Sequence, residues 1–293
     1  MQHFADRLNN AVDRIGSPVC VGLDPVLERL PAAVGWDSPT QRIEAFCHGV
    51  IEAVSGQVAM VKPQLACFER YGSAGWAVYE RVVAHARAAG LLVLADAKRG
   101  DIGISAAHYA AALLEGEHAA DAMTVNPYLG PDTLEPFVDT AARVGGGVFA
   151  LVRTSNPGSD ALQALQLADG RTVAQAVADT VRELGRPHVG RCGESLLGAV
   201  VGATKADDAA ALRKRMPEQV FLLPGYGAQG ATADDVRASF HENREGEPLP
   251  RGAIVTASRS VIYAFDEHAK DWPDAVGAAA QRFASEVREA LLR

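Results

Sequence analysis

Eight short apolar runs, each ending in polar or glycine residues, constrain the fold of this chain most strongly. Between most neighbouring runs lies one segment with the length and the polar-apolar pattern of a helix. Eight such units predict a (β/α)8 barrel, because open α/β sheets more commonly have six strands. The runs end, mostly at intervals of about 22 to 38 residues, near Asp24, Lys62, Asp96, Asn126, Ser155, Thr204, Gly225 and Ser258.

The remaining segments predict one barrel domain that covers residues 1–293. Apolar side chains recur with helical spacing over Phe4–Ile15, which predicts an N-terminal helix. The longest interval, between Ser155 and Thr204, leaves room for a lid or an extra helix after strand five. The polar stretch from His241 to Gly252 predicts a long surface loop after strand seven. A hydrophobic content of 48% is sufficient for a large core.

Charge and cysteine usage exclude several classes of protein. A net charge of −8 argues against a nucleic-acid surface, so that any bound phosphate must be met by local groups. The four cysteines show no CxxC spacing, which argues against a metal site or disulfides and fits a reduced cytoplasm. The first residues are charged where a signal peptide would be apolar, and no apolar run is long enough to span a membrane.

The stretch LLVLADAKRGDIG, Leu91–Gly103, carries the chemistry. Four apolar residues predict a buried strand, and Asp96, Lys98 and Asp101 follow within six residues. The strand period of two points Asp96 and Lys98 the same way, while Gly100 lets the chain turn and re-aim Asp101. Two carboxylates would then flank one ammonium and keep Lys98 protonated, as a cation and proton donor. The alternative is a solvated salt-bridge cluster on the surface.

Two later loops have the composition of a phosphate site. Leu222–Gly230 contains Pro224 and Gly225 in a glycine-rich turn, and Ser258 and Arg259 follow strand eight. In (β/α)8 barrels the seventh and eighth loops commonly bind phosphate, and an arginine can donate to two phosphate oxygens. Taken singly, the glycines could form a plain turn and the arginine could be a surface residue.

The string DAKRGDIG resembles the DxKxxDI motif of the orotidine 5′-phosphate decarboxylases, and the chain is similar to the longer bacterial branch of that family. The resemblance extends from VGLDP near the start to TASRSVIYA near the end. It implies decarboxylation of orotidine 5′-phosphate to uridine 5′-phosphate in pyrimidine biosynthesis, without a metal or an organic cofactor. It also implies a homodimer, because the counterpart of Asp101 in the family reaches the neighbouring subunit's site.

The resemblance also implies a role for individual residues. Asp24 is similar to the ribose-binding aspartate, and Lys62 to a lysine on strand two that joins the charged network of Asp96, Lys98 and Asp101. Ser105 stands where the family usually has threonine, which keeps the hydroxyl and removes a methyl group. Contacts with the substrate are implied for Ile102 and Ser155 at the base and for Gln229 and Arg259 at the phosphate.

Three other functions fit parts of this pattern. A metal-dependent decarboxylase or aldol-type enzyme for a sugar phosphate would suit an acidic residue better than Lys62 at the end of strand two. A Schiff-base aldolase needs a lysine of lowered pKa, and acids beside Lys98 would have the opposite effect. A non-catalytic phosphate-binding protein would not need Asp96, Lys98 and Asp101 together.

Overall fold

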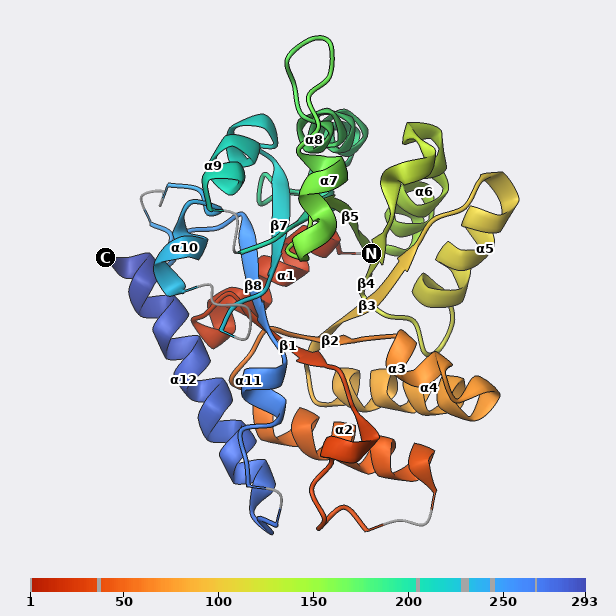
Figure 1. Cartoon of the computed structure of the whole chain (residues 1–293), viewed down its shortest axis with the longest axis vertical. Helices are drawn as coiled ribbons and strands as arrows, with labels where there is room; N and C mark the ends of the chain where they lie inside the picture. Colours follow the sequence, from red (N-terminus) through yellow and green to blue (C-terminus); the bar gives the residue numbers. More distant parts are fainter. Residues whose placement is uncertain (1, 36–37, 204–205, 228–231, 243–245, 267) are drawn as a thin grey trace.

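The fold is a closed barrel of eight parallel strands with helices around it, as the sequence predicted (Figure 1). The computed structural model describes residues 2–35, 38–203, 206–227, 232–242, 246–266 and 268–293. Seven of the eight predicted strand endings fall on residues that the structure describes. The remaining one, Thr204, lies outside the described residues. The strands are β1 (Val19–Leu23), β2 (Met60–Pro63), β3 (Leu92–Arg99), β4 (Ala122–Val125), β5 (Gly147–Arg153), β6 (Ser195–Val201), β7 (Gln219–Pro224) and β8 (Ala253–Ala257).

The longer helices surround the barrel, and their buried apolar residues join the core that the strands form. The short 3-10 helices are η1 (Leu27–Arg29), η2 (Pro127–Leu129), η3 (Pro131–Thr133), η4 (Pro157–Ser159) and η5 (Arg186–His188). The α-helices are α1 (Phe4–Ile15), α2 (Pro39–Val54), α3 (Ala66–Glu69), α4 (Gly72–Ala88), α5 (Gly103–Leu114), α6 (Glu135–Val144), α7 (Asp160–Gln163), α8 (Val173–Gly185), α9 (Ala206–Arg215), α10 (Ala233–Arg237), α11 (Arg259–Ile262) and α12 (Trp272–Leu292).

Helix α1 spans the residues that the sequence predicted and covers the amino end of the barrel. The Phe4 ring packs edge-on against Phe149 of β5, at a centroid distance of 5.9 Å. A Cβ atom added to Gly147 would lie 2.4 Å from the Phe4 ring, so only glycine admits this contact. Since α1 covers that end, a ligand must enter from the carboxyl ends of the strands.

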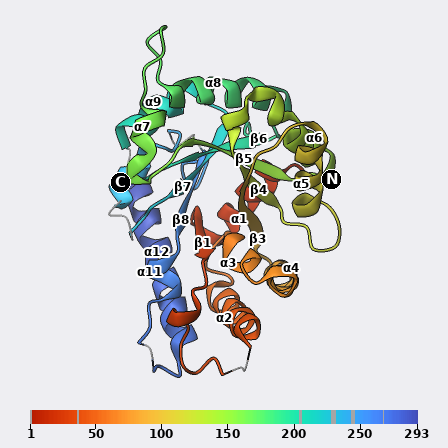
Figure 2. The same ribbon diagram turned by 45° about the vertical axis from the view of Figure 1, so that its right-hand side comes forward.

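The segment after β5 leaves the barrel and returns over it. It contains α7, and then a short antiparallel bridge between Gln166 and Thr172 before α8 begins. This bridged segment projects beyond the body of the molecule in both views (Figures 1 and 2). Among the described residues, no helix combines the length and the apolar character needed to cross a membrane.

Candidate active site

A cavity of about 590 Å³ opens at the carboxyl end of the barrel, where the sequence placed the site. All eight strands or the loops that follow them contribute side chains to its wall, as expected for this architecture. The predicted site residues that line it are Asp24, Lys62, Asp96, Lys98, Ser155, Pro224, Gly225, Ser258 and Arg259.

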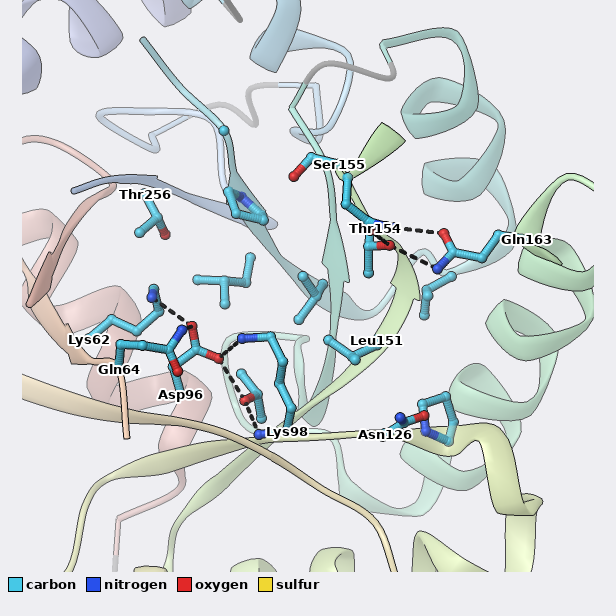
Figure 3. Close-up of a pocket in the computed structure, with 18 of the residues that line it drawn as sticks. Lys62, Gln64, Asp96, Lys98, Asn126, Leu151, Thr154, Ser155, Gln163 and Thr256 are labelled. Carbon is cyan, nitrogen blue, oxygen red and sulfur yellow. Dashed lines mark hydrogen bonds and ion pairs between the residues drawn. The ribbon is translucent and has the colours of Figure 1, made fainter. Parts of the chain in front are cut away.

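Asp96 is the centre of a hydrogen-bonded cluster in the cavity floor (Figure 3). Its Oδ2 accepts from Nζ of Lys62 at 2.7 Å and from the side-chain amide of Gln64 at 3.3 Å. Its Oδ1 accepts from Nζ of Lys98 at 2.5 Å and from the Thr124 hydroxyl at 3.0 Å. One carboxylate therefore binds two ammonium groups and two neutral donors, which fixes its orientation.

Burial separates the two lysines of this cluster. Lys62 is 5% exposed; burial disfavours its charged form, but the charges of Asp96 and then Asp24 outweigh this effect and raise its pKa. Asp96 is 7% exposed, and although burial opposes ionisation, Lys62 and then Lys98 lower its pKa. The Lys98 side chain is 45% exposed. Its ammonium is therefore the one that a ligand in the cavity can reach.

The sequence predicted two carboxylates around one ammonium, and the structure of the single chain shows the reverse. Asp96 lies between Lys62 and Lys98, which extend from opposite sides of it (Figure 3). Asp101 does not line the cavity of its own chain, and its Oδ1 accepts from the main-chain N–H of Ile102 at 2.8 Å. The arrangement differs because Asp101 lies outside this cavity, whereas Lys98, whose backbone has a φ of +48°, brings its ammonium within 2.5 Å of Asp96.

Asp24 follows β1 and faces the same cluster. Its Oδ1 lies 4.0 Å from Nζ of Lys62, and this oxygen has no hydrogen-bond partner among the described residues. Its main-chain carbonyl accepts from the Tyr263 hydroxyl at 2.9 Å, which ties the loop to the end of α11. Oδ1 is itself buried, but the Asp24 side chain is 31% exposed, so the rest of the carboxylate can accept a hydrogen bond from a ligand hydroxyl.

The end of β5 and helix α7 form the opposite wall. The side-chain amide of Gln163 accepts from the Thr154 N–H at 2.8 Å and donates to the Thr154 hydroxyl at 2.9 Å. Arg153, which is buried, donates to Gln163 and, at 2.7 Å, to Asp208 of α9. These bonds fix the backbone beside Ser155, whose side chain lies at the rim of the wall (Figure 3).

The predicted phosphate residues lie together on the β7 and β8 side of the cavity. Pro224 and Gly225 line it at the end of β7, with Gly225 at φ +105°, where a side chain would be strained. Ser258 and Arg259 line it just after β8, and Arg259 is exposed. Gln229 lies outside the described residues.

Among the described residues, the predicted ones that the cavity does not include lie on the loop after β3 and at the start of α5. Ile102 is 63% exposed and Ser105 is also exposed, and neither lines the cavity of this chain. In the part of the chain that the structure describes, no group of three or more histidine, cysteine or acidic side chains is placed to bind a metal ion.

Several cavity residues were not singled out from the sequence. Thr124 of β4 stands two positions before Asn126, which directly follows the strand, so a period of two would have placed both on the inner face. Gln163 lies on a four-residue helix within a long connection, which has no sequence pattern to mark it. Other cavity residues that sequence reasoning did not select are Gln64, Leu151, Thr154, Val200, Leu222 and Thr256.

The fold and the site together define a (β/α)8-barrel enzyme with a lysine–carboxylate cluster at the barrel mouth. Residues 17–270 match the model of the orotidine 5′-phosphate decarboxylase / HUMPS family. The chain therefore belongs to that family. It is 44% identical to an orotidine 5′-phosphate decarboxylase of Rhodopirellula baltica, over 95% of this chain and 97% of the relative.

Further relatives agree with this membership. An orotidine 5′-phosphate decarboxylase of Salinispora arenicola is 45% identical, with 99% of each chain covered. The solved structure of the Leishmania donovani OMP decarboxylase superposes with a TM-score of 0.77 at 32% identity, and all of both chains is covered. Similarity over the full length means that the whole barrel is shared with these proteins.

Proposed function

We propose that this chain decarboxylates orotidine 5′-phosphate to uridine 5′-phosphate and carbon dioxide, as the names of its relatives indicate for them. The observation that carries this proposal is the ammonium of Lys98, which lies in the cavity and is bound to Asp96 at 2.5 Å. The obstacle in this reaction is a carbanion on the pyrimidine ring with no adjacent carbonyl group to accept the charge. A fixed cation beside that carbon lowers the energy of the transition state.

The bonds and charges balance with Lys98 as the proton donor. The bond between the ring carbon and the carboxylate carbon breaks, and its electron pair stays on the ring carbon while carbon dioxide departs. The Lys98 ammonium stabilises this pair and then protonates the carbon. The resulting neutral amine is reprotonated by solvent, which the 45% exposure of the side chain permits.

The other predicted residues bind or orient the substrate. Asp96 holds Lys98 beside the reacting carbon, and Lys62 holds Asp96. Asp24 offers the exposed part of its carboxylate to a ribose hydroxyl. Arg259 and Ser155, which both line the cavity, are our candidates for contacts with the phosphate and the pyrimidine, respectively. Binding energy from the phosphate, which is remote from the reacting carbon, can lower the activation barrier for decarboxylation at the ring.

One assay tests the activity directly. Purified protein is mixed with orotidine 5′-phosphate in the presence of EDTA, and the loss of the orotate ultraviolet absorption is followed. We expect full turnover with EDTA and no trapping of the protein by borohydride. Loss of activity that is restored by added divalent metal would support the metal-dependent alternative, and borohydride trapping would support the Schiff-base alternative.

We propose further that the active unit is a homodimer with shared sites. Asp101 does not line its own cavity, and it lies on a rim where several large apolar side chains are exposed. Such a patch is unfavourable in water and suits a second copy of the chain. The apolar rim comprises Ile102, Ile104 and Tyr109 after β3 and Tyr128 and Leu129 after β4.

Mixed variants test whether sites are shared. An Asp101→Ala chain is mixed with a Lys98→Ala chain, so that a hybrid dimer has one site with both defects and one site with neither. Activity should rise to about a quarter of wild type, because half of the dimers are hybrids with one working site. If subunit exchange is confirmed and activity stays at the level of the parents, Asp101 serves its own barrel.

We propose that the protein works in the cytoplasm as one barrel domain. The proposal is supported by closure of all eight strands into a single barrel and by four free cysteines. Fractionation of cells that express the tagged full chain tests the location.

A further inference from the structure

Thr124 lies in the cavity floor where β3 and β4 lose their regular pairing. Ala95 pairs with Met123 and Arg99 pairs with Val125, so the three residues of β3 between these pairs face Thr124 alone. Such a bulge leaves backbone groups without partners in the ladder, and bulges beside active sites can re-aim a side chain. This bulge contains Asp96 and Lys98.

The Thr124 hydroxyl supplies hydrogen bonds that the ladder lacks. It accepts from the main-chain N–H of Lys98 at 2.9 Å and donates to Oδ1 of Asp96 at 3.0 Å. Thr124 is 1% exposed, so water competes little for these bonds. The Thr124 hydroxyl therefore bonds both to the main chain of Lys98 and to the Asp96 carboxylate, which the Lys98 ammonium also binds.

The backbone of Lys98 needs such support. Its φ is +48°, and among the described residues it is the only non-glycine residue with a positive φ. A residue with a side chain is disfavoured in this region, and such a conformation persists where the surrounding structure holds it. This conformation lets Lys98 and Asp96, two residues apart, meet at 2.5 Å.

We propose that Thr124 is a positioning residue for Lys98. Its hydroxyl holds the strained backbone of Lys98 and orients Asp96, and so places the ammonium against the reacting carbon. This role rests on the decarboxylation proposed above. Because Thr124 itself is almost fully buried, its loss should change the rate of the chemical step more than the binding of substrate.

Three variants separate the hydroxyl from the packing of the side chain. Thr124→Val keeps the shape and removes the hydroxyl, and we expect kcat to fall about 10- to 100-fold with KM within about threefold of wild type. Thr124→Ser keeps the hydroxyl and should stay within about threefold of wild-type kcat. Thr140→Val, at a buried threonine of α6 outside the cavity, is the matched control and should leave kcat unchanged.

Three results would overturn the proposal: wild-type kcat in Thr124→Val, equal losses in Thr124→Val and Thr124→Ser, or a change confined to KM. Thermal unfolding establishes that each variant is folded, and Thr124→Ala replaces the valine variant in the same comparison if that variant does not fold. Wild-type turnover of orotidine 5′-phosphate is measured alongside. Its absence would overturn the proposed function, whereas wild-type turnover together with an unchanged kcat in Thr124→Val would overturn the role of Thr124 alone.

Discussion

The two ends of this barrel both contain buried charges, but the charges are bound in different ways. At the carboxyl end, Asp96 binds Lys62 and Lys98, so that charge is matched by charge. At the amino end, the guanidinium of Arg213 donates to backbone carbonyls, among them those of Gln219 at 2.7 Å and Gly252 at 2.9 Å. The first arrangement leaves one cation exposed to the cavity, and the second leaves none.

At the amino end, Arg213 acts as a cross-link between elements. Arg213 of α9 connects the starts of β7 and β8 and stacks over the Phe221 ring at 3.9 Å. Burial lowers the pKa of Arg213 to about 9, and the charge of Glu194 opposes this effect only in part. Burial raises the pKa of Glu194, although Asn9 donates a hydrogen bond to it at 2.8 Å.

The difference shows what buried charge does in each place. A buried arginine that satisfies carbonyls holds strands and helices together, and its removal leaves those groups unpaired. A lysine in a partly open cluster keeps a charged group ready for a ligand at some cost in stability. We therefore expect changes at the mouth to alter catalysis and changes at the amino end to alter folding.

The largest effect should come from Lys98→Ala. Turnover of orotidine 5′-phosphate should fall at least about 10⁴-fold, because both electrostatic stabilisation and proton donation are lost. Binding of uridine 5′-phosphate, measured by calorimetry, should be retained. A folded variant with more than a tenth of wild-type activity would show that Lys98 does not have this role. The charges at the mouth would then not differ from those at the amino end in their effect on catalysis.

Arg213→Met should have the largest effect on stability. We expect the free energy of unfolding to fall by about 3 to 5 kcal/mol, since a buried charge and several buried carbonyls lose their partners. Urea denaturation measures this value, and kcat of the folded fraction should stay near wild type. Arg282→Met, at an exposed arginine of α12, is the control and should change stability by less than about 0.5 kcal/mol. Comparable losses in both variants would contradict the cross-link.

Arg259→Ala should produce a smaller effect, at the exposed edge of the mouth. The value of kcat/KM for orotidine 5′-phosphate should fall about 10- to 100-fold, because a charged hydrogen bond to a remote phosphate is lost. Turnover of the nucleoside orotidine, which has no phosphate, should change little. Equal losses with both substrates would show that Arg259 does not bind the phosphate.

The smallest effect should be a difference in pH dependence between the two buried carboxyl groups. The lowered pKa of Asp96 contributes stability that is full above its unfolded value of 3.8 and is lost as the pH falls toward the folded pKa. The raised pKa of Glu194 acts in the opposite sense, since its contribution is full below 4.5 and is lost as the pH rises through the folded pKa.

Asp96→Asn and Glu194→Gln test these signs by urea denaturation across the pH range. The stability deficit of Asp96→Asn should shrink as the pH falls below about 4. The stability of Glu194→Gln relative to wild type should rise as the pH increases above about 4.5. Parallel curves for the two variants would mean that the ends of the barrel do not differ in this way.

The sequence by itself determined the barrel and the charged residues that line its mouth. Eight apolar runs with polar endings are a local pattern, and parallel strands can bury them only if the polar endings meet at one edge. Asp24, Lys62, Asp96 and Lys98 could therefore be assigned to one cavity before any contact was known. Helix α1 was predicted at its observed bounds because its apolar spacing is regular.

Only the tertiary structure decided how these charges pair. The bulge that turns Lys98 back to Asp96 depends on the register between β3 and β4, which no pattern within either strand specifies. The contacts of Thr124 and Gln163 join residues 26 and 9 positions apart, so they exist only after the strands and α7 have packed. Local periodicity fixes which face a residue occupies, whereas the partner that it meets there is set by the register of neighbouring elements.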